Sequence, residues 1–133
     1  MTELTPSPKR LTGKILIVDD NEFDVYLLQK QIQEFDVTWA KTADEALILF
    51  AAGFDALVID YLMPGLDGCE LSELIREENN TIPILLVSGV MHENLKCQAK
   101  NLNVIASNKD YVAVAEIIRR TINVNNGRES SPT

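Results

Sequence analysis

Three short runs rich in Ile, Leu and Val constrain the fold of this chain most strongly. They cover residues 14–18, 55–59 and 82–87, and their apolar residues follow one another without alternation. Continuous apolar runs of this length are typical of strands that are buried on both faces, as in a parallel sheet. Residues 37–40 and 103–106 are two weaker candidates of the same kind. The pattern therefore predicts five strands in a parallel sheet.

Between these runs the apolar residues recur at helical spacing. Val25, Leu28 and Ile32 are three and four positions apart, which predicts one face of an amphipathic helix. Further stripes of this spacing occur over 43–50, 71–75, 91–102 and 112–122, and the last helix is expected to begin with Asn108 or Asp110 as its N-cap. Regular alternation of strand and helix predicts an α/β domain with helices on both faces of the sheet.

Composition excludes several classes of protein. The chain has 133 residues and is 46% hydrophobic, enough for one folded domain with a core. Its net charge of -8 disfavours nucleic-acid binding. From the polar N-terminal residues and the short apolar runs we expect no secretory signal and no membrane span. We expect a cytoplasmic domain over 13–124, with disordered tails at 1–12 and 125–133. Cys69, Cys97 and His92 are too few for a zinc site, so both cysteines are expected to be free thiols.

Polar side chains follow four of the five predicted strands. Asp19 and Asp20 follow the first strand, Asp60 the third, Ser88 the fourth and Lys109 the fifth. The carboxyl ends of parallel strands meet at one edge, where α/β proteins gather their functional groups. A single aspartate there is often only a helix cap, but the joint pattern is much less common by chance.

Grouped carboxylates repel one another unless a cation neutralises them. Oxygen ligands without His or Cys favour a hard ion, and a partly hydrated Mg²⁺ fits best. A metal beside a carboxylate, a hydroxyl and an ammonium group is typical of a site that binds a phosphoryl group.

With these residues in place, the sequence resembles the receiver domain of bacterial two-component response regulators. The likeness runs from about Lys14 to Ile122, and its specific parts are 15–21, 60–68, 87–89 and Lys109. The segment at 60–68, Asp-Tyr-Leu-Met-Pro-Gly-Leu-Asp-Gly, is nearly diagnostic. The resemblance implies a flavodoxin-like (βα)5 fold with strand order 2-1-3-4-5. It also implies a stand-alone receiver of the chemotaxis-regulator type.

The resemblance also implies a role for each site residue. Asp60 would accept a phosphoryl group from a histidine kinase or a histidine phosphotransfer protein. Ser88 would be the switch hydroxyl, and Lys109 would pair with the phosphoryl group. The metal ligands are implied to be Asp20 directly, Asp19 mostly through water, Asp60, and the backbone carbonyl of Leu62. Such a receiver catalyses its own phosphorylation and dephosphorylation, is not otherwise an enzyme, and signals to a downstream protein rather than to nucleic acid or membrane.

The sequence departs from the family pattern at two positions near Lys109. Asp110 stands where a proline usually follows the lysine, and Ala106 stands where an aromatic residue usually switches on phosphorylation. These departures leave open a second interpretation, a pseudo-receiver that binds proteins without being phosphorylated. A third interpretation, an aspartyl-phosphate phosphatase, ranks last because that class needs an aspartate at the position of Leu62.

Two apolar residues near the site favour a long lifetime of the phosphorylated aspartate. Leu62 lies two positions beyond the acceptor, and Val90 lies two positions beyond the switch hydroxyl. In the resembling family these positions frame the approach of the hydrolytic water. Neither side chain can hydrogen-bond that water, so we expect slow autodephosphorylation.

Overall fold

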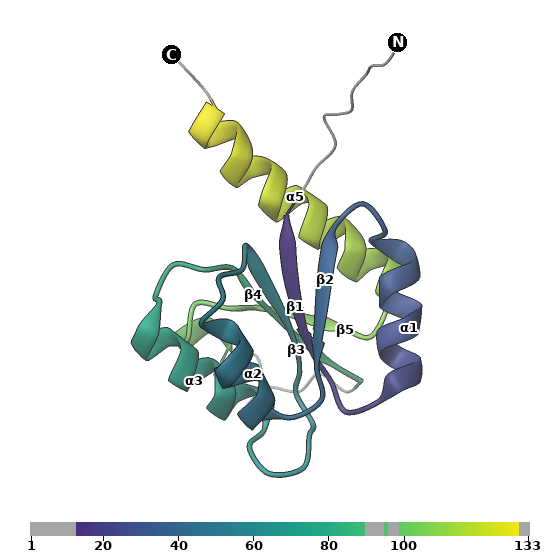
Figure 1. The fold of residues 1–133 in the computed structure, drawn as a ribbon, viewed down its shortest axis with the longest axis vertical. Helices are drawn as coiled ribbons and strands as arrows, with labels where there is room; N and C mark the ends of the chain where they lie inside the picture. Colours follow the sequence, from purple (N-terminus) through teal and green to yellow (C-terminus); the bar gives the residue numbers. More distant parts are fainter. Residues whose placement is uncertain (1–12, 90–94, 96–98, 131–133) are drawn as a thin grey trace.

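The structure, a computed structural model, describes residues 13–89, 95 and 99–130, with side chains described through residue 122. Five strands alternate with helices, as the apolar pattern predicts (Figure 1). The strands are β1 (Lys14–Val18), β2 (Asp36–Ala40), β3 (Ala56–Asp60), β4 (Ile84–Ser88) and β5 (Ile105–Asn108). The helices are α1 (Glu22–Gln31), α2 (Ala43–Phe50), α3 (Gly68–Glu78) and α5 (Tyr111–Ser130).

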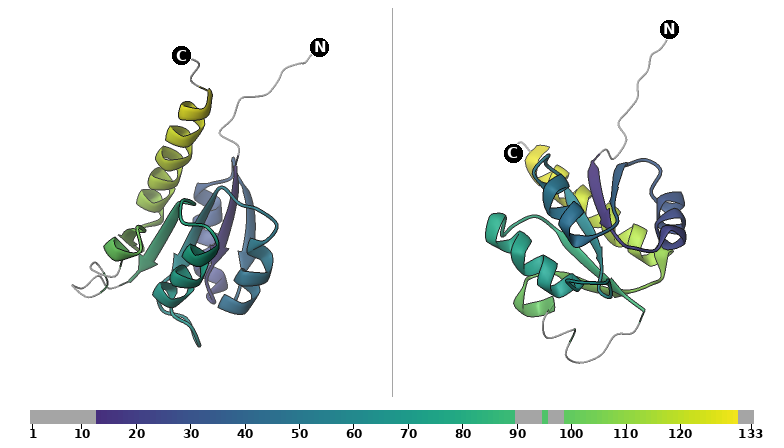
Figure 2. Two further views of the ribbon diagram at one scale, coloured as in Figure 1. Left: turned by 90° about the vertical axis from the view of Figure 1, so that its left-hand side faces the viewer. Right: turned by 60° about the horizontal axis from the view of Figure 1, so that its bottom comes forward.

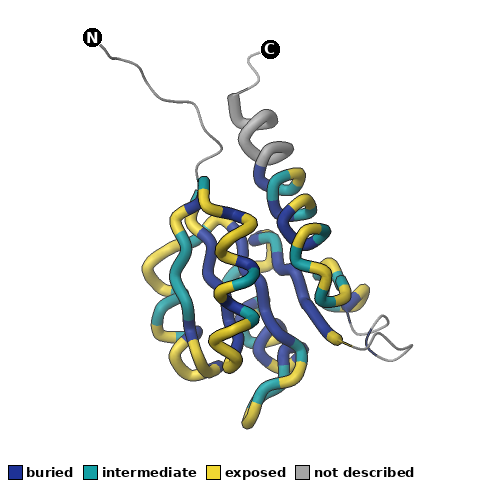
Figure 3. The backbone as a smooth tube through the Cα atoms, turned by 90° about the vertical axis from the view of Figure 1, so that its right-hand side faces the viewer, coloured by how far each residue is buried: buried dark blue, intermediate teal, exposed yellow. Residues whose placement is uncertain are grey.

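All neighbouring strands are parallel, and the sheet has the order β2-β1-β3-β4-β5. This confirms the predicted flavodoxin-like fold. β3 lies at the centre of the sheet, and every one of its residues is buried. Figure 3 shows the central strands as continuous buried segments. This burial explains why their sequences are apolar throughout rather than alternating.

The side chains of the sheet divide into two cores. On one face, Ile15 and Ile17 pack with Val25 and Leu28 of α1 and with Val114 of α5. On the opposite face, the core joins strand residues to α2 and α3; among its fully buried members are Leu16, Ala46, Leu57, Leu71 and Ile75. Helices therefore cover both faces, α1 and α5 on one and α2 and α3 on the other (Figures 1 and 2).

Polar caps begin the helices at the carboxyl edge of the sheet. The side chain of Asn21 accepts a hydrogen bond at the start of α1, and that of Thr42 does so at the start of α2. Asp67 and Glu70 form a reciprocal capping box at the start of α3. Oδ1 of Asp110 accepts a hydrogen bond from the Ala113 N–H, so Asp110 caps α5 as expected.

Three details differ from the sequence analysis or lie outside the structure. β5 covers 105–108 instead of 103–106, because the strand continues through the polar residues Ser107 and Asn108 at the edge of the sheet. α5 continues to Ser130, where the sequence analysis places a disordered tail from residue 125. Most of the helix expected over 91–102 lies outside the described residues. None of the helices in the described segments is long and apolar enough to cross a membrane.

Candidate functional site

The carboxylates of Asp19, Asp20 and Asp60 meet at the carboxyl edge of the sheet. One oxygen from each lies within 4.8 Å of the others. Asp60 is the last residue of β3, and Asp19 directly follows β1, its neighbour in the sheet. The side chains of Asp19 and Asp60 are 7% and 5% exposed, whereas Asp20 is exposed. Two buried carboxylates and one exposed carboxylate therefore form a pocket that opens to solvent on one side.

Asp60 lies at the centre of this group. Its Oδ1 is buried and makes no hydrogen bond to any described residue, although the Lys109 ammonium lies 3.4 Å from it. Burial raises the pKa of Asp60, and the nearby lysine only partly offsets this effect. A buried carboxylate oxygen without a hydrogen bond is an unusual feature of a folded protein. Here it leaves the oxygen available to a metal ion or a phosphoryl group.

Asp19 is held by two hydrogen bonds that fix both its side chain and its backbone. Its Oδ1 accepts the Asn21 N–H at 2.9 Å, and its carbonyl oxygen accepts the indole N–H of Trp39 at 2.7 Å. Burial raises the pKa of Asp19 to about 6; the Asn21 hydrogen bond opposes this rise, and the Asp60 charge adds to it. Burial and the neighbouring Asp60 charge thus both disfavour the ionised form of Asp19.

Lys109 directly follows β5, and its ammonium group lies at this pocket. Its Nζ donates a hydrogen bond to Oδ2 of Asp24 at 3.2 Å and lies near Asp60 as well. Burial lowers the pKa of the lysine, but the surrounding carboxylates more than offset this, and the net pKa is raised. Lys109 is therefore fully cationic at neutral pH.

Ser88 and Leu62 belong to the same edge of the sheet, at the end of β4 and just after β3. Ser88 is buried at the end of β4, and the preceding residue, Val87, pairs with Asp60 across the sheet. Leu62 follows Asp60 by two residues, and 68% of it is exposed. The structure therefore brings six of the predicted site residues to one edge of the sheet, namely Asp19, Asp20, Asp60, Leu62, Ser88 and Lys109. Val90, His92 and Cys97 lie outside the described residues.

The donor set fits a hard divalent cation. Three carboxylates at this spacing, one with a buried oxygen that makes no hydrogen bond, supply oxygen ligands without nitrogen or sulfur. Burial and, to a smaller extent, the Asp60 charge raise the pKa of Asp19, and a cation here would offset both effects. Cys69, by contrast, is a buried free thiol, and burial raises its pKa to about 11.

Two residues that hold the site together were not singled out from the sequence. Gly68 begins α3, and a Cβ there would lie 2.6 Å from Leu86 Cδ1 and 2.8 Å from the carbonyl oxygen of Asp60. Only glycine therefore allows α3 to begin directly against the end of β3. Asp24, on α1, is the other, because its contact with Lys109 joins positions far apart in the sequence.

Fold and site together define a signalling domain whose acidic pocket is typical of a phospho-acceptor and of its Mg²⁺ site. The profile of the response regulator receiver domain matches residues 15–119, and the chain belongs to this family. It is thus a receiver rather than a classical enzyme, and receivers partner histidine kinases.

Curated relatives are much longer than this chain. The chain is 36% identical over 108 residues to the hybrid signal transduction histidine kinase L of Dictyostelium discoideum, a match of 71% of this chain and 6% of that protein. It is 37% identical over 82 residues to the regulatory protein PhoP of Bacillus subtilis, a match of 59% of this chain and 34% of PhoP. The chain thus spans about a third of PhoP and a small fraction of the kinase.

Solved receiver domains have the same fold. A CheY-like receiver of Methanospirillum hungatei superposes with a TM-score of 0.78 at 20% identity, covering 88% of this chain and 98% of that one. The chemotaxis protein CheY4 of Vibrio cholerae superposes with a TM-score of 0.73 at 22% identity, covering 83% and 98%. These likenesses support the fold and not a particular pathway.

Proposed function

We propose that this protein accepts a phosphoryl group on Asp60 from the phosphohistidine of a histidine kinase or a histidine phosphotransfer protein. The observation that carries the proposal is the position of the Asp60 carboxylate. It is buried at the end of the central strand, close to Asp19, Asp20 and the Lys109 ammonium. These neighbours distinguish Asp60 from a carboxylate that is buried for structural reasons alone.

In the proposed transfer, a carboxylate oxygen of Asp60 forms a bond to phosphorus while the phosphorus–nitrogen bond of the donor breaks. The electron pair of that bond returns to the imidazole. The sheet holds Asp60 for in-line attack, and Lys109 offsets the negative charge of the transferred group. We propose that the hydroxyl of Ser88, which is buried at the end of the adjacent strand, donates a hydrogen bond to a phosphoryl oxygen.

We infer that Mg²⁺ is the resident cation, held by Asp19, Asp20, Asp60 and the backbone carbonyl of Leu62. When bound, it offsets charge on the phosphoryl oxygens. The three carboxylates are already grouped on rigid strand ends, so little rearrangement is needed to hold the ion. The resemblance to the receiver family implies the role of the Leu62 carbonyl, since Leu62 follows Asp60 by two residues.

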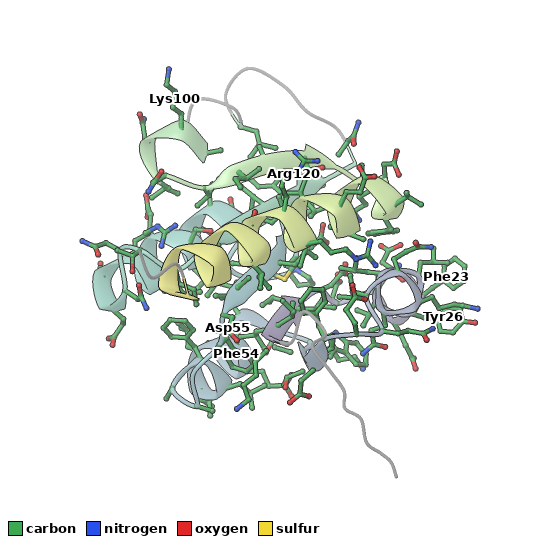
Figure 4. All side chains as sticks on the ribbon, turned by 90° about the horizontal axis from the view of Figure 1, so that it is seen from above. Phe23, Tyr26, Phe54, Asp55, Lys100 and Arg120 are labelled. Atoms are coloured by element: carbon green, nitrogen blue, oxygen red, sulfur yellow. The ribbon has the colours of Figure 1, made fainter. Side chains whose placement is uncertain are left out.

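Apolar side chains around the pocket suit a protein partner. Phe23 and Val112 are 65% and 58% exposed and lie in the first turns of α1 and α5. Phe23 stacks with Tyr26 on the outer face of α1, as seen from above in Figure 4. Exposed apolar residues beside a charged site favour transient docking of another protein. We propose that output also proceeds by protein–protein interaction, with 13–124 as the receiver domain. The tail at 1–12 and the cytoplasmic location stay predictions.

Phosphorylation by a small-molecule donor such as acetyl phosphate tests the proposal. Wild type should gain one phosphoryl group in the presence of Mg²⁺, detected by intact-protein mass spectrometry. Asp60→Asn should gain none while keeping its fold by circular dichroism, and Asp55→Asn, at the opposite edge of the sheet, is the control. Absence of phosphorylation in wild type would favour the pseudo-receiver, which is also consistent with Ala106 at the aromatic switch position.

A further inference from the structure

The Lys109 ammonium is shared between two carboxylates, and only one of them belongs to the acidic pocket. Its Nζ lies 3.2 Å from Oδ2 of Asp24, where it makes a hydrogen bond, and 3.4 Å from Oδ1 of Asp60, where it does not. Asp24 comes from the first turn of α1, and Lys109 comes from the turn between β5 and α5. The lysine is thus shared with a residue that the proposed phosphotransfer does not use.

The surroundings of this ion pair strengthen it. The side chains of Lys109 and Asp24 are 30% and 20% exposed, so solvent screens them only in part. The hydroxyl oxygen of Tyr111 is buried nearby without a hydrogen bond among the described residues. Burial and then the charge of Asp24 raise the pKa of Tyr111. Asp24 is therefore half-buried in an ion pair rather than free in solvent.

We propose that Asp24 is a positioning residue that competes with the acceptor site for Lys109. In the unmodified protein, Asp24 holds the ammonium partly away from Asp60. When a phosphoryl group arrives, Lys109 must turn toward it, and Asp24 loses this partner. Asp24 thereby lowers the affinity of the site for the incoming anion. This inference rests on the function proposed above.

The same negative charge acts in the opposite direction on a cation. Asp24 contributes to the negative potential around Asp19 and Asp60, as its influence on the pKa of both residues indicates. Its charge should therefore favour metal binding. Removing it should weaken the binding of Mg²⁺ and strengthen the binding of a phosphoryl analogue. A purely structural role could not produce opposite changes, because loosening the site would weaken both ligands.

The experiment compares wild type with Asp24→Asn, which keeps the shape of the side chain and removes its charge. The Mg²⁺ affinity is measured alone by calorimetry, and beryllofluoride affinity is measured at saturating Mg²⁺ through the fluorescence of Trp39. Trp39 is the one tryptophan in the sequence, and its indole binds the carbonyl of Asp19. Asp44→Asn removes an exposed first-turn aspartate from α2 and is the matched control.

In Asp24→Asn we expect Mg²⁺ binding to weaken by about threefold and beryllofluoride binding to strengthen by about threefold to tenfold, as expected for one partly screened charge. Asp44→Asn should change neither constant. If melting shows that Asp24→Asn does not fold, Asp24→Ser takes its place. Unchanged constants, or a weakening of both, would overturn the inference while leaving the proposed function intact. Failure of wild type to bind beryllofluoride would overturn both.

Discussion

The backbone N–H of Gly68 donates a hydrogen bond of 2.8 Å to the carbonyl oxygen of Tyr61. This bond closes the loop that leaves Asp60 and brings the start of α3 back against the end of β3. Because the Tyr61 N–H in turn binds the carbonyl of Val87, the loop is tied to β4 as well. The backbone that follows Asp60 is therefore held by both α3 and β4. The phosphotransfer proposed above needs such a fixed position for in-line attack.

Gly68→Ala is expected to destabilise the domain by about 1–3 kcal/mol, the usual range for overpacking. The new Cβ would lie within 3.0 Å of Leu86 Cδ1, of the Asp60 carbonyl oxygen and of Tyr61 Cα. Urea unfolding followed by circular dichroism measures the loss. Gly89→Ala is the control, because a Cβ at Gly89 has no neighbour within 4 Å. Equal stability of the two variants would contradict the steric argument.

Millimolar Mg²⁺ should raise the melting temperature of wild type, since a ligand of the native state stabilises it in proportion to the logarithm of its concentration over Kd. Asp20→Asn should remove most of this response and should itself stabilise the metal-free protein, because it relieves carboxylate repulsion. Thermal melts with Mg²⁺ and with EDTA provide the measurement. A melting temperature indifferent to Mg²⁺ would show that the shared metal site is wrong.

The stability of the metal-free protein should depend on the ionisation of Asp19. Its pKa is about 6 in the folded state and 3.8 in the reference state, so the folded protein binds the proton more tightly. The resulting penalty is fully present above pH 6 and is relieved as the pH falls toward 4. Asp19→Asn should therefore be more stable than wild type by up to about 2 kcal/mol at pH 7.5 in EDTA.

This gain should shrink toward zero near pH 4. Urea unfolding at several pH values measures it, and saturating Mg²⁺ should reverse the order of the two proteins. A gain that did not depend on pH would point to packing rather than to ionisation.

Leu62→Asn is expected to speed autodephosphorylation by about threefold to tenfold, because an amide can hydrogen-bond the attacking water where leucine cannot. Leu62 is largely exposed, so its replacement should leave the stability of the fold nearly unchanged. The decay of phosphorylated protein in excess Mg²⁺ gives the rate, and Ile48→Asn, another exposed apolar residue, is the control. Adding Val90→Glu should increase the rate further.

Phe23→Ser should slow phosphotransfer from a phosphohistidine protein while leaving phosphorylation by acetyl phosphate unchanged. The side chain of Phe23 is exposed in the first turn of α1, where a protein donor can contact it. A small-molecule donor does not depend on this contact. Parallel time courses with the two donors separate docking from chemistry. An equal loss with both donors would mean that the substitution disturbs the site itself.

Much of the fold and most of the pocket could be predicted from the sequence. Continuous apolar runs such as 55–59 identified the buried strands, and the polar residue after each run identified the functional edge. The predicted limits of β5 were less accurate. Its last residues, Ser107 and Asn108, lie on an edge strand that is only partly buried, so they need not be apolar.

The role of Asp24 could not be predicted, because it depends on a contact across 85 positions of sequence. At its own position it resembles any acidic residue in the first turn of a helix, where the helix dipole favours negative charge. Gly68 was visible as part of the segment 60–68, but the reason for glycine there is a steric contact with two other elements. Both signals emerge only when the chain is folded.

The length of α5 has a mechanical consequence. The helix starts two residues after Lys109 and runs past the far edge of the sheet, as Figure 2 shows. Its 20 residues form a rod of about 30 Å at 1.5 Å per residue. A tilt of about 5° at the first turn would displace the last turn of such a rod by about 2.6 Å. A small rotation of the helix beside Lys109 would thus produce a much larger displacement at the opposite end of the domain.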